Sequence, residues 1–232
     1  MFCLDARRKE YFNDYVTVIE DYIPEHLCDQ LAQRVNDVIL SKRVDLVDHE
    51  GLGNKAVSDF GGRYLHHIFK GSDIREHLPE LVSIYHSALP LVSLITCSDA
   101  IVSPYSQSDI NIKAYPPGGG ALGAHYDSNG ITVLLFLTTN KEAPLRMQIP
   151  RSHPSKPDSW IEHRNIYAKK GALLLLQGRK ILHDCEPTKT EQKLTAVLNY
   201  YTEGDTFRHK DFDDFVYYGH SPSGFNATSE GA

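Results

Sequence analysis

The chain has 232 residues, of which 41% are hydrophobic and 23% are charged. This composition is typical of a folded domain with a substantial core, and it excludes an intrinsically disordered chain. The formal net charge of −6 comes without a basic block, which disfavours nucleic acid as the main partner.

The four cysteines lie far apart and form no CxxC pair, so they predict neither a disulfide framework nor a zinc ribbon. The first twelve residues, MFCLDARRKEYF, are too charged for a signal peptide. The best apolar run, 172–176, has the length of a strand and not of a membrane span. We therefore expect a cytoplasmic protein without a membrane segment.

The first part of the chain predicts a strand, a helix and a long loop. Residues 15–20 are β-branched and alternating, which is typical of a strand. Apolar residues recur at helical spacing over 25–40, after a proline suited to a first turn. Residues 41–63 are polar and glycine-containing, which predicts a long loop that can include one short strand, and we expect 48–63 to close over a substrate.

A short aromatic run at 64–69 is followed by a second helical pattern over 74–95. Pro79 suits the first turn of this helix, whereas Pro90 lies in its interior. Because an interior proline removes a backbone hydrogen bond, we expect Pro90 to kink or split the helix.

After Tyr105 the sequence changes to short apolar runs separated by turns, which is the pattern of a β-sandwich or jelly-roll barrel. The predicted strands are 110–115, 131–138, 145–149, 166–168, 172–177, 181–185 and 194–201. We expect one domain over 1–232. It would consist of a strand and helix part at 1–105, a jelly-roll core at about 106–205 and a C-terminal extension at 206–232.

The segment 111–137, NIKAYPPGGGALGAHYDSNGITVLLFL, predicts two strands flanking a glycine-rich turn. His125 and Asp127 are two residues apart at the start of the second strand, so their side chains should share one face. The glycines formally match GxGxxG, but a dinucleotide fingerprint needs a helix directly after them. We therefore interpret the pair as two ligands of a metal site.

A third ligand is expected from a distant histidine, and His183 fits because it lies on a predicted strand. Ten residues later, Lys193, Thr195, Val197 and Asn199 alternate along one face of the next strand. A buried lysine is costly without an anion, so Lys193 and Thr195 predict a carboxylate site. The alternative is that Lys193 points to solvent from an edge strand.

His125-Tyr126-Asp127, the distant His183 and the Lys193/Thr195 pair together resemble the iron(II)- and 2-oxoglutarate-dependent oxygenases. The resemblance covers about residues 110–201, and the opening strand and helix look like the prolyl-4-hydroxylase-like branch. It implies an α+β, mainly β fold: a double-stranded β-helix with N-terminal helices packed on it. It departs from that branch at KEAPLRMQIPR, where related hydroxylases carry a Gly-Gly-Glu segment.

The same resemblance implies the ligands of the cofactor and cosubstrates. Fe(II) would be held by His125, Asp127 and His183, a facial triad that leaves positions open for 2-oxoglutarate and dioxygen. Lys193 and Thr195 would bind the distal carboxylate of 2-oxoglutarate, with Tyr115 as a further donor.

The expected activity is oxidation of an unactivated C–H bond in a small molecule, such as an amino acid or a biosynthetic intermediate. Hydroxylation is the default outcome, with desaturation and oxidative cyclisation open, and the retained Asp127 disfavours halogenation. Two alternatives remain: a peptidyl prolyl-type hydroxylase and a non-catalytic cupin-like binding protein. The residues considered as substrate ligands are Arg63, Arg146, Arg151 and Asn199.

Overall fold

The computed structural model describes residues 2–44, 46–49, 64–120, 122–127, 129–153 and 156–205. Its helices are α1 (Leu4–Asp14), α2 (Glu25–Leu40), α4 (Gly71–His77) and α5 (Pro79–Thr96). Its strands are β1 (Val16–Ile19), β2 (Leu46–His49), β3 (Tyr64–Phe69), β4 (Ala100–Val102), β5 (Ile110–Tyr115), β6 (Leu122–His125), β7 (Ile131–Phe136), β8 (Asn140–His153), β9 (Lys156–Ala168), β10 (Leu173–Leu176), β11 (Leu182–Cys185) and β12 (Lys193–Thr202).

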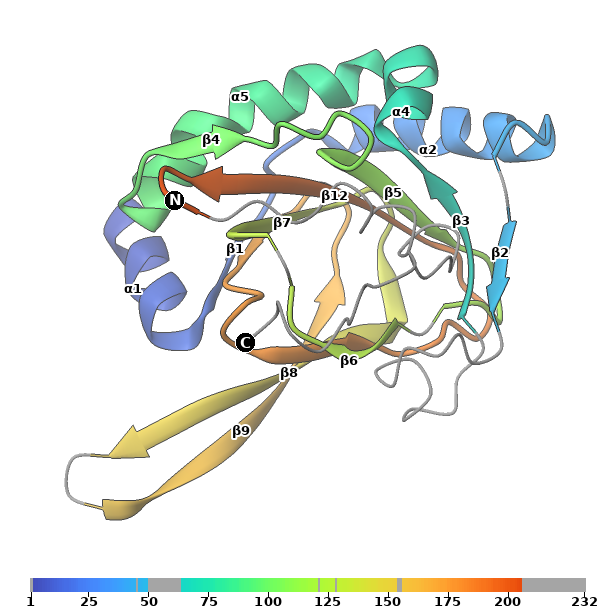
Figure 1. Ribbon diagram of the computed structural model, residues 1–232. Coiled ribbons are helices and arrows are strands. Elements are labelled where there is room, and N and C mark those ends of the chain that lie inside the picture. The colour runs from blue at the N-terminus through green and yellow to red at the C-terminus, as the bar shows by residue number, and fades with distance from the viewer. Residues whose placement is uncertain are drawn as a thin grey trace, which may run out of the picture.

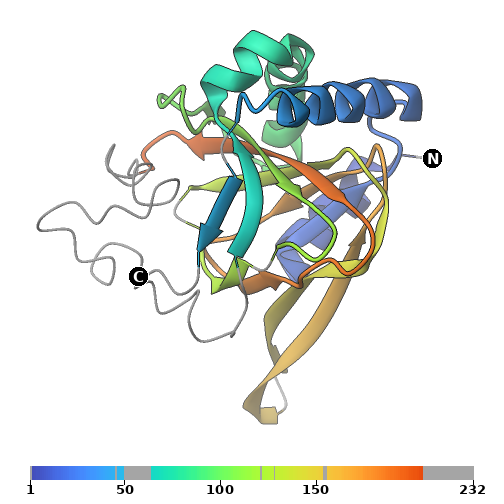
Figure 2. The same ribbon diagram turned by 90° about the vertical axis from the view of Figure 1, so that its right-hand side faces the viewer.

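The strands form two antiparallel sheets that face each other (Figures 1 and 2). The larger sheet has the order β1-β10-β7-β12-β5-β3-β2, with β4 also paired to β12, and the smaller has the order β6-β11-β8-β9. Helices α2, α4 and α5 cover the outer face of the larger sheet. The predicted mainly β, double-stranded β-helix architecture with packed N-terminal helices is therefore confirmed.

Alternation along β12 separates the two faces of the larger sheet. Leu194, Ala196, Leu198 and Tyr200 are buried in the core that includes α2 and α5. The alternate residues Lys193, Thr195, Val197 and Asn199 point toward the space enclosed by the two sheets. The strand therefore contributes apolar groups to the fold on one side and polar groups to the enclosed space on the other.

The helical pattern over 74–95 is broken near Pro79 and not at Pro90. Helix α4 ends at His77, α5 begins with Pro79, and the two are bent by 113°. Pro79 occupies the first turn, where its missing N–H costs nothing, whereas Pro90 lies inside α5 without ending it. Of the two outcomes expected at Pro90, a kink or a split, the split is therefore wrong.

Among the residues that the structure describes, no single helix is long and apolar enough to cross a membrane. The bent pair α4 and α5 passes that test by length and composition only.

Helix α1 was not expected, because its sequence LDARRKEYFND has no apolar stripe. Tyr11 is its one buried residue, and polar contacts hold the helix in place. Arg8 Nε donates to the carbonyl of Leu94 at 2.6 Å, and Gln177 Nε2 donates to the carbonyl of Tyr11 at 2.5 Å.

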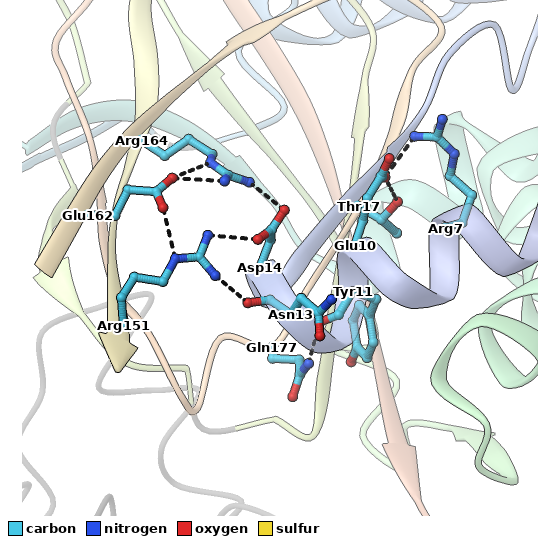
Figure 3. Close-up of polar contacts among 10 residues, drawn as sticks. All are labelled: Arg7, Glu10, Tyr11, Asn13, Asp14, Thr17, Arg151, Glu162, Arg164 and Gln177. Carbon is cyan, nitrogen blue, oxygen red and sulfur yellow. Dashed lines mark hydrogen bonds and ion pairs between the residues drawn. The ribbon is translucent and has the colours of Figure 1, made fainter. Parts of the chain in front are cut away.

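Strands β8 and β9 form a long hairpin that projects from the body (Figure 1). A group of four charged side chains, the hairpin clamp, joins it to the end of α1 (Figure 3). Arg151 donates to Glu162 at 2.8 Å and to Asp14 at 2.7 Å, and Arg164 lies 2.8 Å from Glu162 and 3.2 Å from Asp14. Apolar and polar residues alternate over 145–149 but not regularly in the outer part of the hairpin, which explains why the predicted strands 145–149 and 166–168 were too short.

Candidate active site

Three potential metal ligands meet where the smaller sheet faces the larger one. His125 ends β6 and is directly opposite His183 on β11, with ring centroids 4.4 Å apart. Asp127 Oδ1 lies 3.5 Å from His125 Nε2 and 3.4 Å from His183 Nε2. One ligand atom from each residue lies within 4.8 Å of the others, so a single ion could contact all three.

Asp127 does not lie on a strand, although we expected it to share a strand face with His125. It follows the end of β6, and its N–H donates to the carbonyl of Gly178 at 3.0 Å. A Cβ at position 178 would lie 1.8 Å from Asp127 Oδ2, so glycine is needed there for the carboxylate to fit. The turn after β10 therefore positions the carboxylate.

Hydrogen bonds orient two of the three ligands. His183 Nδ1 lies 3.1 Å from the carbonyl of Ile181, which favours a proton on Nδ1 and leaves Nε2 free to bind a metal. Thr132 Oγ1 donates to Asp127 Oδ2 at 2.5 Å, and Asn129 Nδ2 donates to Thr132 Oγ1 at 2.8 Å. These partners fix the second carboxylate oxygen and leave Oδ1 facing the histidines.

The electrostatics of the cluster favour a carboxylate beside two imidazoles. Burial alone would raise the pKa of Asp127, but His183 and His125 hold that pKa well below its usual range. Burial, together with the charge of His183, lowers the pKa of His125 and so favours its neutral, ligating form. Burial alone would lower the pKa of His183, but Asp127 raises that pKa above its usual value, so a metal ion bound here would displace the proton from Nε2. With both Nε2 atoms deprotonated, two imidazoles and one carboxylate are a donor set that suits non-haem iron(II).

The Lys193 and Thr195 side chains lie beside this cluster on a central strand, because β12 pairs with both β5 and β7. Lys193 is 4% exposed, so the solvent-facing edge-strand alternative is wrong. Its Nζ donates to the carbonyl of Ala143 at 2.7 Å and to Cys185 Sγ at 2.8 Å. Thr195 Oγ1 is buried and has no hydrogen-bond partner among the described residues, so it can still donate to a ligand.

Tyr115 is directly opposite Lys193 across the β5–β12 pair and is 3% exposed. Since opposite residues of an antiparallel pair share a face, its ring lies on the same side of the sheet as Lys193. The structure thus brings together all three residues that the resemblance implies for 2-oxoglutarate.

The residues considered as substrate ligands are not gathered in the same way. Arg146 forms ion pairs with Asp184 at 2.6 Å and with Glu186 at 2.8 Å. Because Asp184 follows His183 along β11, it faces the opposite side of the smaller sheet, and Arg146, directly opposite Asp184, lies on that side too. Arg151 belongs to the hairpin clamp (Figure 3). Asn199 faces the enclosed space, but its Nδ2 donates to the carbonyl of Ser108 at 2.6 Å. Arg63 lies outside the described residues. So does the predicted loop at 48–63, apart from residues 48 and 49, which belong to β2.

Several residues around the cluster were missed. Thr132, Asn129 and Gly178 act on Asp127 through side-chain bonds and a close approach that sequence spacing does not reveal. Lys113 is directly opposite Thr195 and therefore shares its face of the larger sheet. Its place two residues before Tyr115 on a predicted strand was a signal that could have identified it.

No family profile and no curated protein matches this sequence. Solved structures do match the fold. The carbocyclase SnoK from nogalamycin biosynthesis, described as non-haem and α-ketoglutarate-dependent, has a TM-score of 0.67 at 12% identity, covering 89% of this chain and 87% of its own. The epimerase SnoN, in complex with Fe³⁺, α-ketoglutarate and nogalamycin RO, has a TM-score of 0.67 at 12% identity, covering 99% and 94%.

The chain has the fold of the iron- and 2-oxoglutarate-dependent oxygenases. A prolyl-4-hydroxylase from Pseudomonas putida shares this fold at a TM-score of 0.57 and 13% identity, covering 86% of this chain and 98% of its own. Sequence identity this low shows a common architecture, and the activity must be argued from the residues of the site.

Proposed function

We propose that this protein is an iron(II)- and 2-oxoglutarate-dependent oxygenase that oxidises a C–H bond of a small molecule. The observation that carries the proposal is the convergence of His125, Asp127 and His183, whose ligand atoms lie within 4.8 Å of one another. When bound there, iron(II) would supply the activation of dioxygen coupled to oxidative decarboxylation of 2-oxoglutarate, and three facial ligands leave room for both cosubstrates.

Lys193 and Thr195 would bind and orient the distal carboxylate of 2-oxoglutarate. Lys193 supplies a buried positive charge, and a carboxylate would replace the weaker carbonyl partner that it has at Ala143. Thr195 supplies a buried hydroxyl, and Tyr115 lies on the same face. The two sheets enclose these groups and limit the access of water, which strengthens each of these interactions.

A small-molecule substrate is favoured over a peptide. SnoK and SnoN, whose names place them in nogalamycin biosynthesis, have TM-scores of 0.67, compared with 0.57 for two prolyl hydroxylases. EctD from S. alaskensis, whose structure contains 2-oxoglutarate and 5-hydroxyectoine, lies between them at a TM-score of 0.60. Lys113, on the face that carries Thr195, would be the cation for an anionic group of the substrate. Of the arginines considered, the two that the structure describes, Arg146 and Arg151, do not lie on this face.

The test is turnover of 2-oxoglutarate by the purified protein. With Fe(II), ascorbate and oxygen, we expect succinate to form, and to form faster when a small-molecule library contains the substrate. His125→Ala and His183→Ala should each abolish this activity while the protein stays folded. Stimulation by proline-containing peptides, but by no small molecule, would contradict the substrate class. Absence of succinate under all conditions would favour a binding protein.

A further inference from the structure

Cys185 and Lys193 make an unusual contact beside the candidate metal cluster. Lys193 Nζ lies 2.8 Å from Cys185 Sγ, and both side chains are shielded from solvent, with Lys193 4% exposed and Cys185 partly buried. A backbone carbonyl, that of Ala143, holds the ammonium group from another side at 2.7 Å. The sulfur and nitrogen atoms are therefore held near each other by the fold and not by a chance encounter of flexible side chains.

The other cysteines lack such a neighbour. Cys97 is exposed and its Sγ lies 3.9 Å from the carbonyl of Leu94, while Cys28 is buried at the start of α2. Cys3 is exposed before α1. The charge of Lys170 acts on Cys28, but its ammonium group donates to Asp29. Among the described residues, Cys185 is the cysteine whose thiol accepts a hydrogen bond from a lysine, so we confine chemistry that needs both groups to Cys185.

We propose that Cys185 and Lys193 are a redox modification site, at which oxidation by dioxygen joins Sγ to Nζ through one bridging oxygen atom. The ammonium group of Lys193 first releases one proton to solvent. The resulting amine and the thiol then each lose one hydrogen atom, and new N–O and O–S bonds form. Dioxygen supplies the bridging atom, and its second oxygen atom leaves with the two hydrogen atoms as water. Nitrogen and sulfur each give up two electrons, and dioxygen accepts all four.

The reverse step needs a thiol reductant such as dithiothreitol. Two dithiol molecules return four electrons and four hydrogen atoms, which restores the amine and the thiol and releases the bridging oxygen as water. The modification is therefore reversible, unlike the sulfinic and sulfonic acids that form when a cysteine is oxidised beyond the sulfenic acid. The short contact suits a bridge of one atom, because the two side chains need little movement to accept it.

The bridge would switch off the site, and this consequence rests on the proposed function. Bridged nitrogen no longer carries the ammonium charge that would bind the distal carboxylate of 2-oxoglutarate. The metal cluster is untouched, since neither Cys185 nor Lys193 is one of the three ligands. We therefore expect the bridged protein to bind a metal ion and to have lost its affinity for 2-oxoglutarate.

The test compares wild-type protein kept in dithiothreitol with protein exposed to air-saturated buffer. Peptide mass spectrometry without reduction should find the Cys185 and Lys193 peptides joined, with one added oxygen atom and two hydrogen atoms lost. Reduction should restore the separate peptides. The Cys97→Ser variant should form the link as wild type does, and Cys185→Ser should not form it.

Binding is then measured by calorimetry with Mn(II)-loaded protein and 2-oxoglutarate. Reduced protein should bind, and the linked protein should bind at least tenfold more weakly until it is reduced. Oxidation of Cys185 alone, a link without the oxygen atom, or no reaction in air would each overturn the proposed site. If the link forms but reduced protein does not bind 2-oxoglutarate, the redox site stands and the proposed function fails.

Discussion

Lys193 is the residue on which cosubstrate binding depends most directly. Lys193→Met keeps the length of the side chain and removes its charge. We expect the 2-oxoglutarate concentration needed for half-maximal turnover to rise by about tenfold or more, since a charged hydrogen bond contributes roughly 1.5–3 kcal/mol. Mn(II) affinity should stay within about threefold of wild type, because Lys193 is not one of the three metal ligands. An equal fall in both affinities would show that Lys193 has a structural role.

Thr132 orients the carboxylate ligand, and Thr132→Val removes its hydroxyl with little change in shape. Because the bond to Asp127 Oδ2 is 2.5 Å long and shielded, we expect metal affinity to fall by about 10–100-fold. Equilibrium dialysis with Mn(II) measures this change. Thr96→Val, which removes a hydroxyl bonded within α5, is the matched control and should leave metal affinity unaltered.

At the scale of elements, the hairpin clamp ties β8 and β9 to α1. Asp14 accepts from Arg151 and approaches Arg164, and all three side chains are partly exposed. Asp14→Asn should therefore cost only about 1 kcal/mol in the free energy of unfolding, measured in urea. Asp5→Asn removes a carboxylate that is 91% exposed, and its effect should stay within about 0.5 kcal/mol. Equal effects of the two substitutions would contradict the clamp.

Glu142 holds the turn that leads into Lys193, and this contact should depend on pH. The hydroxyl of Thr190 and the N–H groups of residues 189–191 lower the pKa of Glu142 from 4.5 to about 2. A carboxyl group whose pKa is lower in the folded protein than in the unfolded chain stabilises the fold above its unfolded-state pKa. This stability is lost as the pH falls through its folded-state pKa. The stability difference between wild type and Glu142→Gln should therefore shrink as pH falls from 4.5 to about 2. A difference that is constant over this range in urea unfolding would contradict the assignment.

For the whole molecule, much of the fold could be predicted because alternation and turn residues report directly on buried strands. The runs that became β5, β7, β10, β11 and β12 are apolar on at least one face, and their predicted positions agree closely with the structure. Helix α1 and the outer part of the β8–β9 hairpin could not be found in this way. Charged side chains and tertiary contacts stabilise both elements, and neither leaves an apolar period.

The candidate site shows the same division. His125, Asp127, His183, Lys193 and Thr195 could be proposed from their order and spacing, since residue types alone carry that pattern. The fixing of Asp127 by Gly178 and the contact between Cys185 and Lys193 could not be predicted, because they depend on how distant turns approach each other. The same holds for the ion pair between Arg146 and Asp184, which depends on the pairing of β8 with β11.

Anaerobic titration of the reduced protein with Fe(II) and 2-oxoglutarate, followed by visible absorption, tests the proposed oxygenase site most directly. We expect a weak charge-transfer band that saturates at one 2-oxoglutarate per protein and disappears in His183→Ala. A protein that binds Fe(II) but develops no such band, or a band that survives in His183→Ala, would contradict the assignment of this site to 2-oxoglutarate-dependent oxidation.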